Sequence, residues 1–342
     1  MAYLDQLPDD VALLIRTKFI AEFATVSKAG VPINTPLVPF TSEDFETIDS
    51  ATGLGYPAKA DRVRRNPKVG MLFEGSPDGP VVSIAGIAAV RDSDFQKNLE
   101  RYLAEEILTA MLNPEHVDYE SVTRKAIWYF TRIIICVKPA HVRWWRNPTA
   151  MHEPPQEWRA PADTVYPQSD PAPTGEPSKA PWGEAPSWQD LAHRAIARKA
   201  PVHLTLLDAE GFPLPMRARQ VHAHEAGFRL LMPQWLPWSV GKASVSFEGI
   251  ETFIGEASIA NSQALVRVER ALPVHPLMAD PCEILNPKPA TQQALMKRIQ
   301  YELDRRGLPL PTMPAHPPEP TAGARFRAKD AFAFSGFSTG AG

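Results

Sequence analysis

Short apolar segments with the alternation and β-branched content of strands recur along the chain, each bounded by glycine, proline or other turn residues. In the first half they lie at residues 19–27, 32–40, 47–50, 69–73, 81–90, 128–137 and 141–145. Apolar residues at helical spacing predict helices at residues 8–18, 58–65, 94–112 and 118–126. This mixture predicts an α+β protein that is mainly β, with helices flanking the sheets.

The second half repeats the pattern of the first. Residues 203–221, HLTLLDAEGFPLPMRARQV, follow the order of residues 23–40, FATVSKAGVPINTPLVPF: strand, glycine turn, proline two residues after the glycine, strand. The later strands find counterparts at residues 228–233, 243–249, 252–259 and 264–276. Helices are predicted at 188–199 and 290–306, and residues 326–337 are expected to add a final strand. A pattern that recurs in this order indicates an internal duplication.

Proline divides the chain into parts. Many of its 36 prolines fall between residues 147 and 190, where apolar periodicity is almost absent. Large aromatic side chains in that stretch favour a segment that lies on a folded surface. We therefore expect a first domain at residues 1–146, a proline-rich linker at 147–187 that wraps along the domains, and a second domain at 188–342.

Composition excludes several classes of function. The chain has 342 residues and a net charge of −3, which gives no reason to expect nucleic acid or an anionic membrane as a partner. No apolar run approaches the roughly 20 residues that span a bilayer. The N-terminal segment is acidic where a secretory signal is basic, so we expect a cytoplasmic protein. The nine histidines and two cysteines show no metal-ligand spacing, so no metal site is predicted.

The block from Thr47 to Phe73 carries the clearest candidate chemistry. A strand end is followed by a loop with two glycines and by a short helix that begins after Pro57, whose missing N–H suits that position. The helix N-terminus offers unpaired N–H groups and a positive dipole end, and Lys59 adds a charge in the first turn. These features favour an anion. They also fit a solvated basic helix, and the residues by themselves leave both interpretations open.

The order of these segments resembles the FMN-binding split barrels, the superfamily of pyridoxamine 5′-phosphate oxidase. The resemblance covers about the first 150 residues, including the segments VVSIAGIAAVRD at 81–92 and IWYFTRIIICVKPAHVRWW at 127–145. It implies two split β-barrels in a pseudo-twofold tandem arrangement, with the flavin between them. The second half has only PQWLPWSVGK where the first has its lysine-bearing helix. The resemblance therefore implies one phosphate site, with the second half supplying one wall.

The same resemblance assigns residues to the cofactor. Lys59 matches the phosphate-binding lysine, Ser50 and Thr52 match the hydroxyl-bearing loop, and the strand at 35–38 matches the strand under the ring. Prolines in that strand remove backbone donors, which fits either a strand facing a ligand or an irregular edge strand. The residues expected to bind the cofactor are Thr35, Pro36, Leu37, Val38, Ser50, Thr52, Lys59 and Arg65.

The departures from the oxidase concern the phosphate site and the substrate. The oxidase has arginine at the positions of Thr35 and Ala58, and the loss of these two charges weakens the expected phosphate binding. It has lysine at the position of Phe40, and the loss of this charge for the phosphate of the vitamin makes pyridoxamine phosphate an unexpected substrate. An apolar or aromatic molecule is expected instead. The residues expected to contact it are Phe40, Arg143 and Trp145. Packing in a core or interface remains the alternative role for Trp145, and a surface role remains the alternative for Arg143.

The predicted function is that of an FMN-dependent oxidoreductase acting on a small molecule, with NAD(P)H as a candidate electron donor. A flavoprotein needs no acid–base pair of its own, because the cofactor carries the difficult step. The alternatives are a deazaflavin- or haem-binding split barrel and a non-catalytic flavin-binding module. A homodimer can form in addition to the internal pseudo-dimer.

Overall fold

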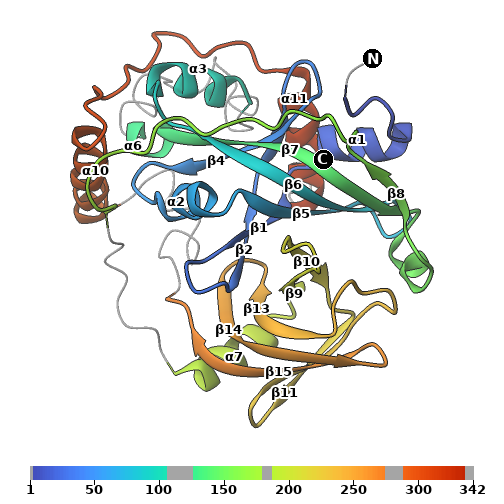
Figure 1. Ribbon diagram of the computed structural model, residues 1–342. Helices are drawn as coiled ribbons and strands as arrows, with labels where there is room; N and C mark the ends of the chain where they lie inside the picture. The colour runs from blue at the N-terminus through green and yellow to red at the C-terminus, as the bar shows by residue number, and fades with distance from the viewer. Residues whose placement is uncertain (1–2, 106–125, 179–186, 274–287, 336–342) are drawn as a thin grey trace, which may run out of the picture.

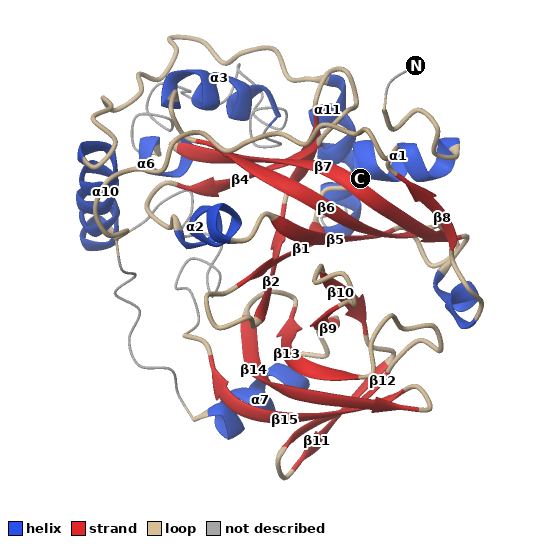
Figure 2. Ribbon diagram, viewed as in Figure 1, coloured by secondary structure: helices blue, strands red, loops and turns tan. Residues whose placement is uncertain are grey.

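The computed structural model of the protein describes residues 3–105, 126–178, 187–273 and 288–335. The helix predicted at 118–126 lies almost wholly outside these residues, as does the last part of the one predicted at 94–112. Fifteen strands form two curled antiparallel sheets, one from each half of the chain, in the described residues (Figure 1, Figure 2). The fold is mainly β with flanking helices, as predicted.

The strands of the first half are β1 (Ala21–Val26), β2 (Pro32–Leu37), β3 (Pro39–Thr41), β4 (Ile48–Gly53), β5 (Lys68–Glu74), β6 (Val81–Arg91), β7 (Arg132–Trp145) and β8 (Gln156–Arg159). Those of the second half are β9 (Val202–Leu207), β10 (Pro213–Arg217), β11 (Gln220–His224), β12 (Gly227–Leu231), β13 (Val240–Phe247), β14 (Glu251–Ala260) and β15 (Gln263–Ala271). The helices are α1 (Asp9–Thr17), α2 (Ala58–Arg65), α3 (Phe95–Glu105), α6 (Ile127–Phe130), the 3-10 helix η1 (Pro148–His152), α7 (Trp188–Ala197), α10 (Pro289–Asp304) and α11 (Ala322–Ser335).

The two sheets share one topology. The first has the order β2-β1-β5-β6-β7-β4-β3, with β8 beside β7, and the second has the order β10-β9-β13-β14-β15-β12-β11. Each strand of the first sheet up to β7 therefore has a counterpart in the second. This confirms the duplication predicted from sequence, and it adds the pair β3 and β11, which the pattern did not distinguish.

The duplication extends to single backbone groups. The turns after β1 and β9 each contain a glycine in the left-handed region, Gly30 with φ +74° and Gly211 with φ +83°. The N–H of each glycine donates to the carbonyl oxygen three residues earlier, at 2.9 Å in both turns. The register of β6 with β7 and of β14 with β15 breaks at equivalent glycines, Gly86 and Gly255. These matches fix which residues of the two halves correspond.

The halves pack against each other reciprocally. Strand β10 lies against β5 and β1, and its counterpart β2 lies against β13 and β9. Such an exchange of matching surfaces defines a pseudo-twofold interface within one chain. The backbones approach closely here, because a Cβ added to Gly70 of β5 would lie 1.7 Å from the carbonyl oxygen of Pro213. Only glycine fits at that point of the contact.

A buried charge network crosses this interface. His203 of β9 is 2 % exposed, with Nε2 3.0 Å from Oε2 of Glu74 and Nδ1 3.3 Å from Oε1 of Glu22. Arg217 lies 3.6 Å from the other oxygen of Glu74. Burial alone would lower the pKa of His203, but the carboxylates of Glu22 and Glu74 outweigh burial and raise the pKa above 6.5. The His203 side chain thus links the second half to two strands of the first.

The C-terminal helices return to the first half of the molecule (Figure 1). Leu295, Ile299 and Leu303 of α10 belong to the same apolar core as α1 and α2, and α11 packs against α1 and α3. The prediction of a final strand at 326–337 is wrong for the described residues, because α11 is a helix there. The segment AGARFRAKDAFAFS contains five alanines, two arginines and one lysine, which favour helix over strand.

The proline-rich segment follows the surface of the first half as far as residue 178. A carboxylate oxygen of Asp170 accepts a hydrogen bond of 2.8 Å from the backbone of Asp92. The carbonyl of Thr174 accepts one of 2.9 Å from Arg305 of the chain just after α10. No helix among the described residues combines the length and apolar character needed to cross a bilayer.

Candidate functional site

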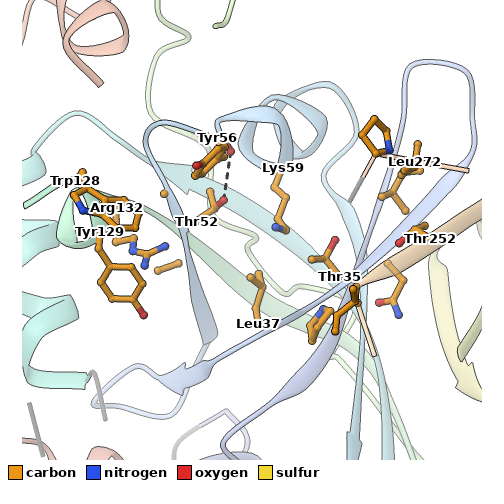
Figure 3. A pocket seen from close by; sticks show the side chains of 18 residues that line it. Thr35, Leu37, Thr52, Tyr56, Lys59, Trp128, Tyr129, Arg132, Thr252 and Leu272 are labelled. Carbon is orange, nitrogen blue, oxygen red and sulfur yellow. Dashed lines mark hydrogen bonds between the residues drawn. The ribbon is translucent and has the colours of Figure 1, made fainter. Parts of the chain in front are cut away.

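A cavity of about 290 Å³ opens between the two halves. Strand β2, the end of β4, the loop that follows, α2 and α6 form one wall, and the second half forms the other (Figure 3). The lining residues of the first half are Ile33, Asn34, Thr35, Pro36, Leu37, Ala51, Thr52, Gly53, Tyr56, Lys59, Trp128, Tyr129 and Arg132. Those of the second half are Gly249, Ile250, Thr252, Leu272 and Pro273.

Strand β2 ends the first sheet, so it pairs with β1 on one side only. Its other side faces the cavity and strand β13 of the second half. The interpretation of this proline-containing strand as an edge strand is confirmed, and its residues 33–37 line a cavity; that the strand faces a ligand stays a prediction. Proline is compatible with such an edge because the missing N–H is not needed for a ladder there.

Lys59 is the candidate anion ligand of the cavity. It stands in the first turn of α2, half-buried, and its side chain extends from the helix toward the space between Thr52 and Thr35 (Figure 3). Within the described parts of the chain its ammonium makes no hydrogen bond and no ion pair. Burial, together with the positive charges of Arg62 and Arg132, lowers the pKa of this ammonium to about 7. An anion in the cavity would offset both effects.

The loop before α2 is held in a fixed shape. The N–H of Tyr56 donates to the carbonyl of Gly53 at 2.9 Å, and the N–H of Leu54 donates to the carbonyl of Thr131 at 3.0 Å. The hydroxyl of Thr52 donates to the carbonyl of Tyr56 at 3.5 Å, as the dashed line in Figure 3 marks. The loop and the helix N-terminus thus face the cavity together, which is the arrangement that binds phosphate in other folds.

Asn34 of β2 supplies a buried polar group to the cavity. It is 1 % exposed, and its amide nitrogen donates to Glu22 at 2.5 Å. Its carbonyl oxygen Oδ1 has no hydrogen-bond partner among the described residues. A buried acceptor left without a donor is unfavourable, so a ligand that donates a hydrogen bond would be stabilised here.

Sequence reasoning missed the aromatic and cationic end of the cavity. Trp128 and Tyr129 of α6 line it, and the guanidinium carbon of Arg132 lies 4.0 Å from the centre of the Tyr129 ring. The apolar run at 128–137 predicted a single buried strand, whereas its first residues form a helical turn and β7 begins at Arg132. The arginine inside that run, Arg132, was the available signal.

The structure brings together five of the eight residues expected to bind the cofactor, namely Thr35, Pro36, Leu37, Thr52 and Lys59. It places the other three elsewhere. The Ser50 hydroxyl donates to the Val38 carbonyl at 3.0 Å and ties β4 to the segment between β2 and β3. Arg65 is exposed on α2. None of these three lines the cavity.

The three residues expected to contact the substrate also lie outside the cavity lining. Phe40 is 1 % exposed and belongs to a separate apolar cluster near α3. Trp145 packs on Trp235 of the second half with ring centres 5.1 Å apart, and the Arg143 guanidinium lies 5.7 Å from the same ring. The interface packing considered for Trp145 is what the structure shows.

The pseudo-symmetry explains this placement. By strand register, Leu272, which lines the cavity, is the counterpart of Arg143. The late strand of each half therefore faces the site of the other half. At the position equivalent to the cavity, Met232 replaces Thr52, no lysine-bearing helix follows, and Trp235 packs into the interface core. The equivalent position is also hollowed, because Gly75, Ser76, Arg217 and Ala218, the register counterparts of Gly249, Ile250, Pro36 and Leu37, line a second cavity of about 730 Å³. Among the described residues this second cavity has no counterpart of Lys59 and its helix.

Comparisons with known proteins find likeness in structure only. No family model and no curated protein matches the sequence. The structural neighbours are pyridoxamine 5′-phosphate oxidase-like FMN-binding proteins and related chains. A conserved hypothetical protein from Mycobacterium tuberculosis is 19 % identical with a TM-score of 0.33, the match covering 42 % of this chain and 88 % of that one.

Two further neighbours are described by a function or a cofactor. A pyridoxamine 5′-phosphate oxidase-related, FMN-binding protein from Nostoc punctiforme is 17 % identical with a TM-score of 0.30, over 41 % of this chain and 85 % of that one. A protein described as an F420 reductase is 18 % identical with a TM-score of 0.30, over 41 % of this chain and all of that one (100 %). At this similarity the comparisons do not determine the cofactor or the reaction of the present chain.

Proposed function

We propose that the cavity between the halves binds a flavin-type cofactor through its phosphate, and that the protein is an oxidoreductase for a small, apolar or aromatic molecule. The observation that carries the proposal is the ammonium of Lys59, which is half-buried in the first turn of α2, extends toward the cavity and has no partner among the described residues. A buried cation is costly without a counter-ion. A phosphate is the anion that this loop and helix N-terminus would hold best.

The remaining lining fits the rest of such a cofactor. Arg132 and Thr52 lie on the same wall as Lys59 and would share the phosphate. The unpaired oxygen of Asn34 offers an acceptor for a ring N–H group. Trp128 and Leu272 provide aromatic and apolar surface for a flat ring system. These residues would bind and orient the cofactor and exclude water from it.

The bound cofactor would supply hydride transfer, with NAD(P)H as the proposed electron donor. FMN and a deazaflavin share the anionic tail and the flat ring, so the cavity suits either. Haem is most often held by an axial His, Cys or Met and less often by Tyr, and of these types only Tyr56 and Tyr129 are among the described lining residues. We therefore rank haem below the flavins.

The apolar substrate is proposed from the walls around the ring. Ile33, Leu37 and Ile250 are aliphatic and face the cavity from both halves. Removal of their surface from water would favour an apolar molecule. No charged side chain of the second half lines this cavity in the described residues, so a second anionic group on the substrate would find its cations only near Lys59 and Arg132.

The test is to identify and titrate the cofactor. Mass spectrometry of the small molecules that copurify should detect FMN or a deazaflavin, and fluorescence titration of the apoprotein should give one binding site per chain. Reduction of the bound cofactor by NADPH, followed at its visible absorption band, tests the oxidoreductase activity. Failure of the apoprotein to bind either cofactor at micromolar concentration would contradict the proposal.

A further inference from the structure

The loop between β4 and α2, which lines the proposed cofactor cavity, packs on its other side against a helix near the C-terminal end of the described chain. Helix α10 follows both sheets in sequence, yet it lies beside α2 and α6 at the edge of the first half (Figure 1). Its apolar face contacts the loop closely, since a Cβ added to Gly55 would lie 3.7 Å from Ile299 and 3.9 Å from Leu295. The backbone of Gly55 therefore packs directly against α10.

One polar side chain of α10 makes the directed contacts. The Nε of Arg298 donates to the carbonyl of Gly55 at 2.9 Å, and its guanidinium carbon lies 5.3 Å from the centre of the Tyr56 ring. A terminal nitrogen of the same guanidinium donates to the hydroxyl of Ser178 at 3.4 Å, at the end of the described proline-rich segment. Arg298 thus joins the cofactor loop, α10 and the wrapping segment.

We infer that Arg298 is a positioning residue for the cofactor, acting through Gly55 and Tyr56. This inference rests on the proposed function. Tyr56 lines the cavity, and α2 with Lys59 begins two residues later, so a shift of the Gly55–Tyr56 backbone would move Lys59. A charged donor fixes a carbonyl more strongly than a neutral one. The affinity for the cofactor is therefore set partly by a helix that does not line the cavity.

The experiment compares three variants of the full-length protein. Arg298→Met keeps the long side chain against Tyr56 and removes the donor and the charge. Arg298→Lys keeps the charge and one donor. Lys297→Met removes the exposed charge of the preceding residue of the same helix and serves as the matched control.

Two measurements are made on each variant. The dissociation constant for FMN should rise by about tenfold in Arg298→Met, change less than about twofold in Lys297→Met and be partly restored in Arg298→Lys. Amide hydrogen exchange in peptides that cover residues 53–57 should speed up in Arg298→Met only, because the N–H groups of Leu54 and Tyr56 are hydrogen-bonded in the supported loop.

The outcomes separate this inference from the proposed function. Unchanged exchange in a folded Arg298→Met, or faster exchange with unchanged affinity for FMN, would overturn the positioning role. If the wild type binds neither FMN nor a deazaflavin, the proposed function fails and the effect on affinity fails with it. The exchange data then still decide whether Arg298 fixes the loop. Should Arg298→Met not fold, Arg298→Gln, which removes the charge and keeps a polar side chain, takes its place against Lys297→Met, with the same expected direction of both effects.

Discussion

The pH dependence of cofactor binding tests the role of Lys59 directly. The pKa of its ammonium is about 7, because burial and the charges of Arg62 and Arg132 disfavour the charged form. A bound phosphate favours that form and raises the pKa. The wild type should therefore bind FMN best at or below pH 7. Its affinity should fall by up to about tenfold for each pH unit above 7, until the pKa of the bound state is reached.

Substitution gives the size of the contribution. A hydrogen bond between a charged donor and a phosphate is worth about 1.5–3 kcal/mol, which corresponds to roughly ten- to a hundredfold in affinity. Lys59→Met keeps most of the side-chain volume and should weaken binding by that factor near neutral pH, with little dependence on pH. Lys59→Arg stays charged throughout, so its affinity should also vary little between pH 7 and 9.

The matched control is on the same helix. Arg65→Met removes an exposed charge, and it should change the affinity less than about twofold and keep the pH profile of the wild type. Arg64 is unsuitable as a control, because it is ion-paired with the buried carboxylate of Asp92 and its loss would destabilise the fold.

The assay is quenching of FMN fluorescence by the apoprotein in steps from pH 7 to 9. This window lies above the second pKa of a phosphate monoester, about 6, so the ligand keeps its charge. Two results would refute the reasoning: equal affinity of the wild type and Lys59→Met, or a wild-type affinity that stays constant across the window.

Three further predictions concern the pairing of the two halves. Glu22 and Glu74 raise the pKa of His203 above 6.5, so its stabilising charge is fully present below pH 6.5 and is lost as the pH rises through the raised pKa. Between pH 6.5 and 9 the melting temperature of the wild type should therefore fall relative to that of His203→Gln. Plots of melting temperature against pH that run parallel for the two proteins would contradict this. Trp235→Ala should reduce the free energy of unfolding by about 2–4 kcal/mol in denaturant titrations, because a partly buried interface ring is truncated; it should leave the stoichiometry at one cofactor per chain, and a second bound FMN would disprove the assignment of a single site. A fragment of residues 1–148 should aggregate or dimerise, because it bares the faces of β2 and β5 that the second half covers; a soluble, folded monomer in analytical ultracentrifugation would count against it.

Local sequence patterns determined the elements and their repetition. The glycine turns at Gly30 and Gly211 and the alternating strands predicted both sheets, because turn conformation and strand period depend on neighbouring residues alone. The helix at 58–65 followed for the same reason, with Pro57 at its start and Asn66-Pro67 after its end. Lys59 could therefore be placed beside a loop and a helix N-terminus before the fold was known.

Local pattern failed where the neighbours of a segment decide its state. Residues 326–335 contain apolar residues that suit a strand as well as a helix, and the helix is favoured by their alanine content and by the faces of α1 and α3 on which it packs. Phe40 stands next to the predicted ring-binding strand in sequence, yet its side chain is buried in another cluster near α3. The face of a curled sheet on which a side chain lies depends on the curvature of the sheet and on the elements packed against it, and neither can be read from the sequence.

Only the tertiary structure decided which segments meet at the cavity. Leu272 and Thr252 come from the second half and Tyr56 from the first, and α10 supports Tyr56 from beyond both sheets. Arg143 and Trp145 are excluded from the lining because a twofold interface turns the late strand of each half toward the opposite site. Contacts between residues two hundred positions apart arise from the packing of completed sheets, and no periodicity within either segment encodes them.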